Sequence, residues 1–390
     1  MSYVRLIPSM VDYAESFKQL DSSDFTIIKA ICKSGFSNIN ALAEDVGIPQ
    51  QTVSYHLKKF DKKGLVRFRA LTDEAKLGLK SYVVIATSSL GKEDFSSMAA
   101  TCFPLWRYLA VVDGWKRGSY LRYVIPSDKE RDMKVFLEEL VKRNIITDFE
   151  LLPSTSPSYP LLNLDFYIGK KGIPVFEWEN WVKDYDSFHE VELDEPEDYG
   201  KAKFDLYDLI ILRCLEIDAR TMQRNIVKQI GRIMEDKDEK KYIPLVSRRI
   251  RESIIPQCLV KGLRTYLFPN PAPTALFFMY HLTFRNKSSL QKFVTGLSHL
   301  PYNTGFEKIL NRNELFVRFI IPIYECSKMR KAFMQLAENG YLKDAHLLFG
   351  NLGSTWDNVE IYQMFKDGMW NFSFGIAMEM LEKTITPKKA

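Results

Sequence analysis

Apolar positions near the start of the chain recur every three or four residues, which is the spacing of an amphipathic helix. Three helices and a short alternating strand are predicted in this way, over residues 21–34, 39–46, 50–63 and 65–70. Asp21 can cap the first helix, and Gly47 and Pro49 form the turn between the second and the third. Helix, turn, helix and strand in this order predict a winged helix-turn-helix head.

A body with a different pattern follows the head. Its strands are expected from their β-branched and aromatic content and its helices from amphipathic spacing, in the order β-α-β-β-α-β: 81–87, 93–103, 107–112, 120–125, 128–143 and 148–152. This order is typical of a split βαβ unit, in which two helices cover one side of an antiparallel sheet. The fold class is therefore predicted to be α+β, with a ferredoxin-like body.

The second half of the chain repeats this organisation. The segment Val317-Arg318-Phe319-Ile320-Ile321-Pro322 parallels Leu121-Arg122-Tyr123-Val124-Ile125-Pro126, and Asp205 and Asp208 parallel Asp21 and Asp24. We therefore predict a tandem repeat of two heads and two bodies. The predicted boundaries are 1–76 for the first head, 77–190 for the first body with its tail, 191–203 for an acidic linker, 204–270 for the second head and 271–390 for the second body with its tail.

The second head departs from the first in two places. Residues 235–241 lengthen the turn before its third helix, and Pro256 shortens that helix. Two interpretations stay open: a degenerate head, or a head that contacts the DNA backbone without reading bases.

Charge is informative where it is local. The net charge of +5 on 390 residues is only mildly basic, but between Lys58 and Arg69 six basic residues accompany one acid, Asp61. Lys and Arg can contact phosphates, and Gln can read adenine. The candidate DNA contacts are Gln50, Gln51, Thr52, Ser54, Tyr55, Lys58, Lys59, Lys62, Arg67 and Arg69, with Arg248, Arg249 and Arg251 in the second head. The alternative is an ordinary solvated helix face.

Other chemistry leaves little trace in the sequence. There is no phosphate-binding loop, no dinucleotide fingerprint and no HExxH motif, so we expect no catalytic residue, no metal, no cofactor and no enzyme activity. His56 is interpreted as a polar surface residue that can face phosphate. Five scattered cysteines form no CxxC pair, and no secretory signal or membrane span is evident. These features favour a cytoplasmic protein with reduced thiols.

Three segments resemble the leucine-responsive regulator/AsnC family of transcription regulators. They are Leu20-Asp21-x-x-Asp24-x-x-Ile27-Ile28, Lys63-Gly64-Leu65-Val66 and Leu77-Gly78-Leu79-Lys80. The resemblance covers residues 20–152 and, more weakly, 204–349. It implies a head that binds double-stranded DNA and an ACT-like (RAM) body that dimerises. It also implies an amino-acid effector site at the turn that contains Asp113, Gly114, Trp115 and Gly118.

The repeat adds an expectation about assembly. The partner that a single-copy relative finds in another chain can be supplied here by the second body, so we predict an intramolecular pseudo-dimer with two non-identical heads. The two tails are rich in aromatic residues, which leaves a further homodimer open: Phe176, Trp178, Trp181, Trp370, Phe372 and Phe374.

Two rival functions remain. Some proteins that resemble this family decarboxylate sirohaem, and Arg107, Arg117 and Arg122 could serve such an enzyme, although the first body has no histidine. The other rival is a protein-interaction scaffold, whose heads would not shift duplex DNA.

Overall fold

The fold was analysed in a computed structural model of the chain. It describes residues 19–34, 39–63, 66–167, 176–193, 195–196, 199–236, 238–267 and 275–386, without the side chains of Ser34 and of residues 351–354. Some predicted features lie outside the described residues: Gly64 and Leu65 at the start of the predicted strand, and Asp194, Glu197 and Asp198 in the predicted acidic linker.

The first head contains three helices and one strand, as the apolar spacing predicts. These are α2 (Ser22–Ser34), α3 (Ile39–Val46), α4 (Gln50–Lys63) and β1 (Arg67–Thr72). Asp21 and Asp24 cap α2 reciprocally: the Asp24 amide donates to Asp21 Oδ1 at 3.0 Å, and the Asp21 amide donates to Asp24 Oδ2 at 2.8 Å. Phe25, Val53 and Phe60 are among the buried residues of the core of this head.

The second head has the same order of elements with a distorted third helix. Its elements are α8 (Leu206–Ile217), α9 (Gln223–Ile233), the 3-10 turn η3 (Glu239–Lys241), α10 (Tyr242–Arg249), the π-helical turn η4 (Ile250–Ile254) and β6 (Val260–Tyr266). Asp205 caps α8 by the same reciprocal arrangement with Asp208. The π turn precedes Pro256, whose ring cannot continue a helix. The third helix is therefore shorter and less regular than α4.

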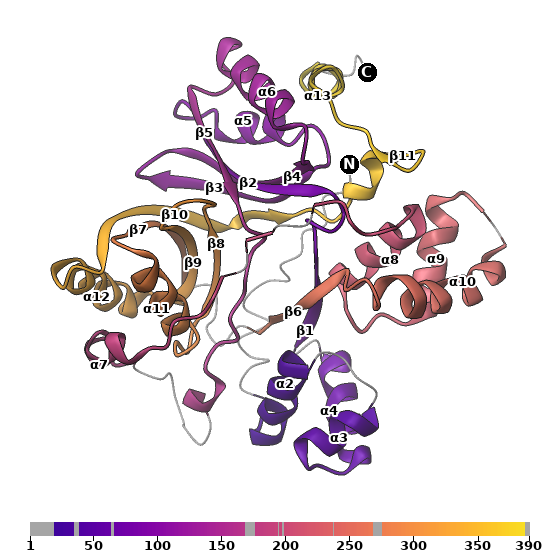
Figure 1. The fold of residues 1–390 in the computed structure, drawn as a ribbon, viewed down its shortest axis with the longest axis horizontal. Helices are drawn as coiled ribbons and strands as arrows, with labels where there is room; N and C mark the ends of the chain where they lie inside the picture. Colours follow the sequence, from indigo (N-terminus) through magenta and orange to yellow (C-terminus); the bar gives the residue numbers. More distant parts are fainter. Residues whose placement is uncertain are drawn as a thin grey trace.

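The strands that follow the two heads pair with each other. β1 and β6 form an antiparallel two-stranded ribbon, with Arg69 opposite Arg264. In Figure 1 this ribbon lies between the first head, at the bottom, and the second head, at the right. The strand predicted after the third helix is present in each head, and the two strands join the heads by pairing with each other.

The bodies contain the predicted β-α-β-β-α-β order twice. The first is built from β2 (Leu79–Thr87), α5 (Glu93–Ala100), β3 (Trp106–Gly114), β4 (Gly118–Pro126), α6 (Glu130–Lys142) and β5 (Asp148–Ser154). The second is built from β7 (Ala275–Phe284), α11 (Lys287–Leu297), β8 (Asn303–Lys308), β9 (Glu314–Pro322), α12 (Cys326–Glu338) and β10 (Leu342–Asp357).

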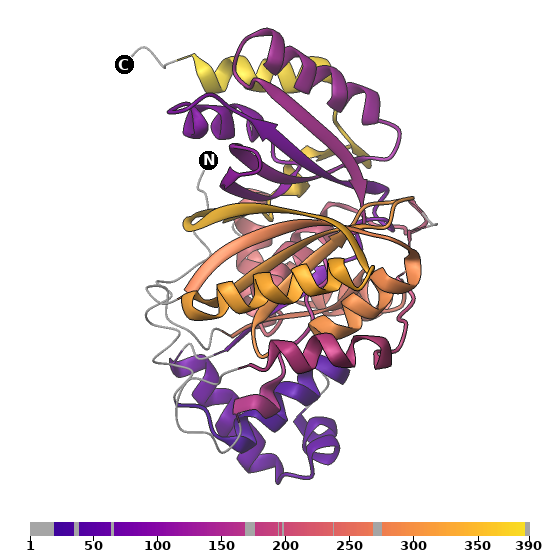
Figure 2. The ribbon, with the colours of Figure 1, turned by 90° about the vertical axis from the view of Figure 1, so that its left-hand side faces the viewer.

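The two bodies share one antiparallel sheet of eight strands in the order β5-β2-β4-β3-β10-β7-β9-β8. The junction is the pairing of β3 with β10, in which Leu109 lies opposite Trp356 and Ala110 opposite Thr355. Each body thereby covers an edge strand that would otherwise be exposed. Figure 2 shows the helices of each body on the side that faces away from the other body.

The tail that follows each body packs against the other body. The tail of the first body contains α7 (Trp178–Lys183), which packs against α12 of the second body. The tail of the second body ends in α13 (Phe374–Ile385), which packs against α5 and α6 of the first body (Figure 1). Trp178, Trp181 and Phe372 are buried by these contacts, at 3–4% exposure. The aromatic residues that suggested a homodimer surface therefore include core residues of the chain itself.

None of the helices in the described part of the chain combines the length and the apolar character that crossing a membrane requires.

Candidate nucleic-acid interface

The exposed face of α4 is polar and open. Gln50, Gln51, Lys58 and Lys62 are exposed, and Tyr55 has 66% of its surface accessible. These side chains can be exposed because Val53, Leu57 and Phe60 turn the opposite face of the helix into the core. Thr52 and Ser54 are half-buried at the border. The amides and the hydroxyl near the start of the helix can donate to base edges, and the two lysines can contact phosphates.

Two basic residues of α4 are held inside the head. Asp24 is fully buried, and its carboxylate contacts His56 Nδ1 at 2.5 Å and the ammonium group of Lys59. Lys59 also lies 3.5 Å from Asp21 Oδ2. The prediction that His56 lies on the surface is wrong, because the residue is 7% exposed. Lys59 binds the capping carboxylates of α2 instead of facing solvent.

Asp21, Asp24 and His56 also place three potential metal-ligand atoms within 4.8 Å of one another. The Lys59 ammonium already supplies a positive charge to both carboxylates. The lysine therefore takes the position that a metal cation would have between the two carboxylates. The cluster also links the start of α2 to the middle of α4.

The second head shows the same link with an arginine. Arg249 binds the carboxylate of Asp205 and lies 3.5 Å from that of Asp208. Arg249 is thus engaged within the head, whereas Arg248 and Arg251 are exposed. Ile243 and Ile255, with 52% and 65% exposure, flank this helix. This surface is more apolar than the corresponding face of α4.

The two arginines of β1 differ in exposure. Arg67 is exposed. Arg69 is 9% exposed: its Nη1 donates to Asp357 Oδ2 and to the Tyr266 hydroxyl, both at 2.6 Å, and its Nε donates to the carbonyl of Glu216. The prediction that Arg69 contacts DNA is therefore wrong. Arg67 and Arg69 point to the same face of β1, because side chains two residues apart share a face. They differ because Arg67 is the first residue of the strand, whereas Arg69 lies further along it, beside Glu216, Tyr266 and Asp357.

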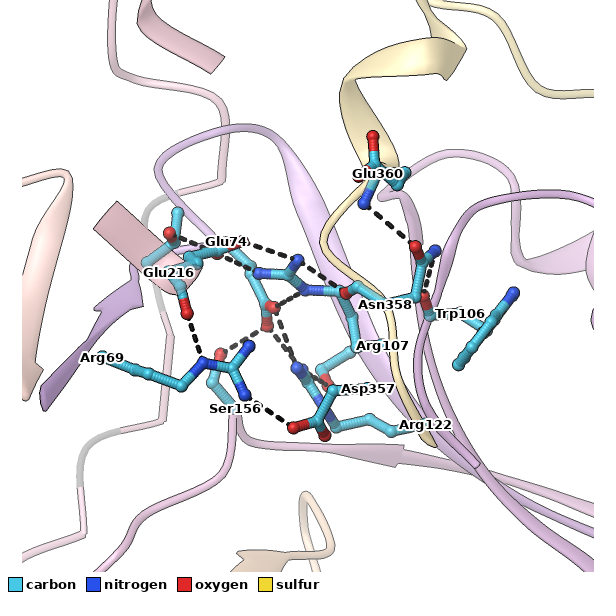
Figure 3. A network of polar contacts seen from close by, with 12 residues as sticks. Arg69, Glu74, Trp106, Arg107, Arg122, Ser156, Glu216, Asp357, Asn358 and Glu360 are labelled. Atoms are coloured by element: carbon cyan, nitrogen blue, oxygen red, sulfur yellow. Dashed lines mark hydrogen bonds and ion pairs between the residues drawn. The ribbon is translucent and has the colours of Figure 1, made fainter. Parts of the chain in front are cut away.

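Arg69 belongs to a buried network of charges at the base of the β1–β6 ribbon (Figure 3). Arg107 binds Glu74 at 2.8 Å and also contacts both carboxylate oxygens of Glu216, and Arg122 binds Glu74 at 2.6 Å. Burial opposes ionisation of Glu74, but Arg122 and Arg107 outweigh it and hold the pKa of Glu74 well below its ordinary value. The network joins β1, α8 and the first body.

This network was not predicted from the sequence. Glu74, Glu216 and Asp357 lie in three different segments, and their partners appeared only as candidates for an enzyme or for DNA. One signal was present: Arg107, Arg122 and Arg318 occur inside otherwise apolar strands, where an unpaired charge is costly. Such arginines imply buried carboxylate partners, although the pattern alone does not name them.

The predicted effector turn is used for contact between the bodies. The Trp115 amide donates to the carbonyl of Leu347 at 2.9 Å, and the indole stacks on His346 at 4.4 Å. Gly114 has φ +120°, and a Cβ there would lie 2.7 Å from the same carbonyl. Gly118, at φ +145°, is equally confined, while Asp113 is exposed and pairs with Arg117. The glycines are therefore explained by packing, and an amino-acid site at this turn stays a prediction.

Comparisons with known proteins agree with part of this description. Residues 20–67 match a family model described as a winged helix-turn-helix DNA-binding domain. A search of curated proteins gave no match. Among solved structures, siroheme decarboxylase NirDL is similar over 93% of this chain and 100% of its own, with 12% identity and a TM-score of 0.51. An AsnC family transcriptional regulator from Agrobacterium tumefaciens is similar over 38% of this chain and 100% of its own, with 20% identity and a TM-score of 0.32.

The first of these structures corrects one prediction. We expected no enzyme, yet the fold that extends over 93% of this chain is the fold of an enzyme. The same fold is seen in NirDL in complex with an iron-uroporphyrin III analogue, with 11% identity and a TM-score of 0.51. At these identities the likeness concerns the fold, and the winged helix-turn-helix match over residues 20–67 indicates a DNA-binding domain.

Proposed function

We propose that this chain is a transcription regulator that reads double-stranded DNA with the exposed face of α4. The observation that carries the proposal is the open polar stripe of Gln51, Tyr55, Lys58 and Lys62, on the third helix of a segment that matches a winged helix-turn-helix family. A helix of this kind fits the major groove, where its N-terminal half reaches base edges and its basic residues contact the backbone.

The two heads have different roles in this proposal. The first head supplies the reading helix. The second head has a shorter third helix with exposed Ile243 and Ile255, and its Arg248 and Arg251 are suited to backbone contacts. We infer that the chain is a tandem repeat whose halves form a pseudo-dimer, and the pairing of β3 with β10 and of β1 with β6 supports this inference. Because operator symmetry mirrors protein symmetry, two unlike heads should select an asymmetric site.

The direct test is selection of binding sites by the full chain from a random duplex pool. We expect one enriched asymmetric motif whose affinity falls as the salt concentration rises. No enrichment, together with no electrophoretic shift of duplex DNA at about 50 mM salt, would contradict the proposal. It would then favour the interaction scaffold or the enzyme.

An enzyme of the siroheme decarboxylase type is the second candidate function. The observation that favours it is the fold shared with NirDL over 93% of the chain, together with the arginines that line two adjoining pockets beneath the ribbon: Arg69, Arg107, Arg122, Arg264 and Arg318. Guanidinium groups suit a substrate that carries several carboxylates. Incubation with sirohaem under reducing and oxidising conditions tests it. Loss of carbon dioxide, followed by mass spectrometry, supports decarboxylation, and an unchanged tetrapyrrole excludes sirohaem as the substrate.

A further inference from the structure

A cavity of about 160 Å³ lies where the first head, the ribbon and the bodies meet. Cys32 of α2 contributes to one wall and β6 to another, and the segment 159–162 crosses it. The remaining wall comes from the shared sheet, through Tyr108 of β3 and residues of β7, β8, β9 and β10. A cavity on the order of 150 Å³ can hold a body the size of benzene. The space is therefore suited to a small molecule.

Two arginines at this cavity have guanidinium groups that can accommodate a further hydrogen-bond acceptor. Arg318 is 5% exposed, and its Nη2 donates to Glu307 Oε1 at 2.7 Å, but its Nε has no hydrogen-bond acceptor among the described residues. Arg264 lies 4.0 Å from Asp357 Oδ2, a distance too long for a hydrogen bond. Both guanidinium carbons lie within 5.1 Å of the ring centroid of Tyr159. The buried hydroxyl of Thr304, which also lines the cavity, has no partner in the described part of the chain.

Among the described residues around the cavity, guanidinium groups outnumber carboxylates. Arg107 and Arg122 are matched by Glu74 and Glu216 in the neighbouring part of the network. Arg264 and Arg318, which line the cavity, and Arg69, which lines the adjoining pocket, share two described carboxylates, those of Asp357 and Glu307. A buried charge without a counter-charge is costly. One additional negative charge in the cavity would complete the arrangement.

The rest of the lining is mixed. It includes polar groups such as those of Asn303 and Thr304, together with a set of apolar side chains: Leu162, Leu263, Phe277, Ile320 and Trp356. We propose that the cavity binds a small monocarboxylate with an apolar body about the size of one aromatic ring, whose carboxylate lies between Arg264 and Arg318. Arg318 Nε would donate to that carboxylate, and the ring would rest among the apolar side chains. This site is separate from the turn at residues 113–118 and needs no DNA.

Titration calorimetry on the full chain without DNA tests the proposal, with benzoate as the probe and benzamide as its neutral analogue. We expect saturable benzoate binding at one site and at least tenfold weaker binding of benzamide, because only benzoate supplies the missing charge. Equal binding of the two compounds, or no benzoate binding, overturns the proposal. Since DNA is absent, this outcome is independent of the proposed DNA binding.

Three variants locate the site. Arg318→Met should weaken benzoate binding at least tenfold. Ile320→Phe keeps every charge but fills the cavity, so it should also abolish benzoate binding. If Arg318→Met does not fold, Ile320→Phe alone tests whether benzoate binds in this cavity. Arg312→Met is the matched control, because Arg312 is exposed in a turn of the same body and pairs only loosely with Glu314, at 3.6 Å. Benzoate binding that survives Ile320→Phe unchanged places the probe elsewhere and overturns the assignment.

Discussion

Arg69 in β1 and Asp357 at the end of β10 are 288 positions apart in the chain, yet Nη1 and Oδ2 lie 2.6 Å apart in a buried ion pair. Burial opposes ionisation of Asp357, but the guanidinium groups of Arg69 and Arg264 outweigh it and keep the pKa of Asp357 below its ordinary value. The pair fixes the ribbon between the heads to the sheet of the bodies. The position of the heads is thus set by an interaction inside the molecule.

Arg69→Met should therefore reduce stability without affecting a DNA surface. Removal of one partner leaves Asp357 buried with less compensation, so we expect the free energy of unfolding to fall by about 3–5 kcal/mol. Urea unfolding measures it. Arg67→Met, two residues away and exposed, should change stability by less than about 0.5 kcal/mol. A variant Arg69→Met with unchanged stability and a flatter salt dependence of DNA binding would contradict this interpretation.

Neutralising the exposed lysines of α4 should weaken DNA binding through the backbone. In Lys58→Gln and Lys62→Gln, each lost phosphate contact should flatten the plot of log K against log salt by about 0.9. Fluorescence anisotropy over a salt series provides the slopes. Lys134→Gln is the control, because Lys134 is an exposed lysine of α6 in the first body. Slopes that stay the same in both α4 variants would show that this face does not bind DNA.

Gln51 should contribute to sequence preference. It is exposed near the start of α4, where a recognition helix reaches base edges. Gln51→Ala should lose about 1–3 kcal/mol of binding free energy on the selected site and little on random duplex. Competition binding with both DNAs measures the difference. Equal losses on the two would mean that Gln51 does not read bases.

The elements that sequence analysis predicted well are those with local signals. The cap at Asp21, its parallel at Asp205 and the apolar spacing of α2 and α4 are properties of neighbouring residues, and α2 and α8 begin directly after these two aspartates. The strand order within each body also followed, because β-branched runs alternate with amphipathic segments. Of the candidate DNA contacts on α4, Gln51, Tyr55, Lys58 and Lys62 are exposed, whereas Lys59 binds Asp24.

The contacts that sequence analysis missed are long-range. Arg69, Lys59 and Arg249 look alike as basic residues beside a helix-turn-helix, but only tertiary contacts decide that Asp357, Asp24 and Asp205 bind them. The ribbon of β1 and β6 depends on the arrangement of two heads, which no local window contains. The exchange of α7 and α13 between the bodies is missed for the same reason, because an amphipathic helix shows that it needs a partner but not which one.

Glu74 gives the network a pH dependence with a definite sign. The pKa of Glu74 is lowered in the folded chain by Arg122 and Arg107, against burial. Its contribution to stability is therefore complete above the ordinary glutamate value of about 4.3 and declines as the pH falls below that value. Glu74→Gln should lower the free energy of unfolding by about 3–5 kcal/mol at pH 7. The difference in this free energy between the variant and the natural chain should become smaller in acid.

Urea unfolding at a series of pH values gives the free energy of unfolding of Glu74→Gln and of the natural chain as a function of pH. Glu44→Gln serves as the control, because Glu44 is exposed on α3. It should lose little stability at any pH. A Glu74→Gln difference that stays constant down to about pH 3 would show that folding does not lower the pKa of Glu74.

The last prediction concerns the independence of the pseudo-dimer from any other chain. β3 and β10, β1 and β6, and the exchanged helices α7 and α13 all join the two halves. A protease site inserted after Glu192, an exposed residue between the halves, should therefore allow cleavage without dissociation. Sedimentation should give a mass near 45.4 kDa before and after cleavage, while a denaturing gel shows two fragments. Urea should unfold the nicked chain at a lower concentration, because cleavage removes the high effective concentration of one half for the other. Separation of the fragments in native buffer would show that the shared sheet is too weak to hold the halves. A mass twice as large before cleavage would show that a second chain completes the assembly.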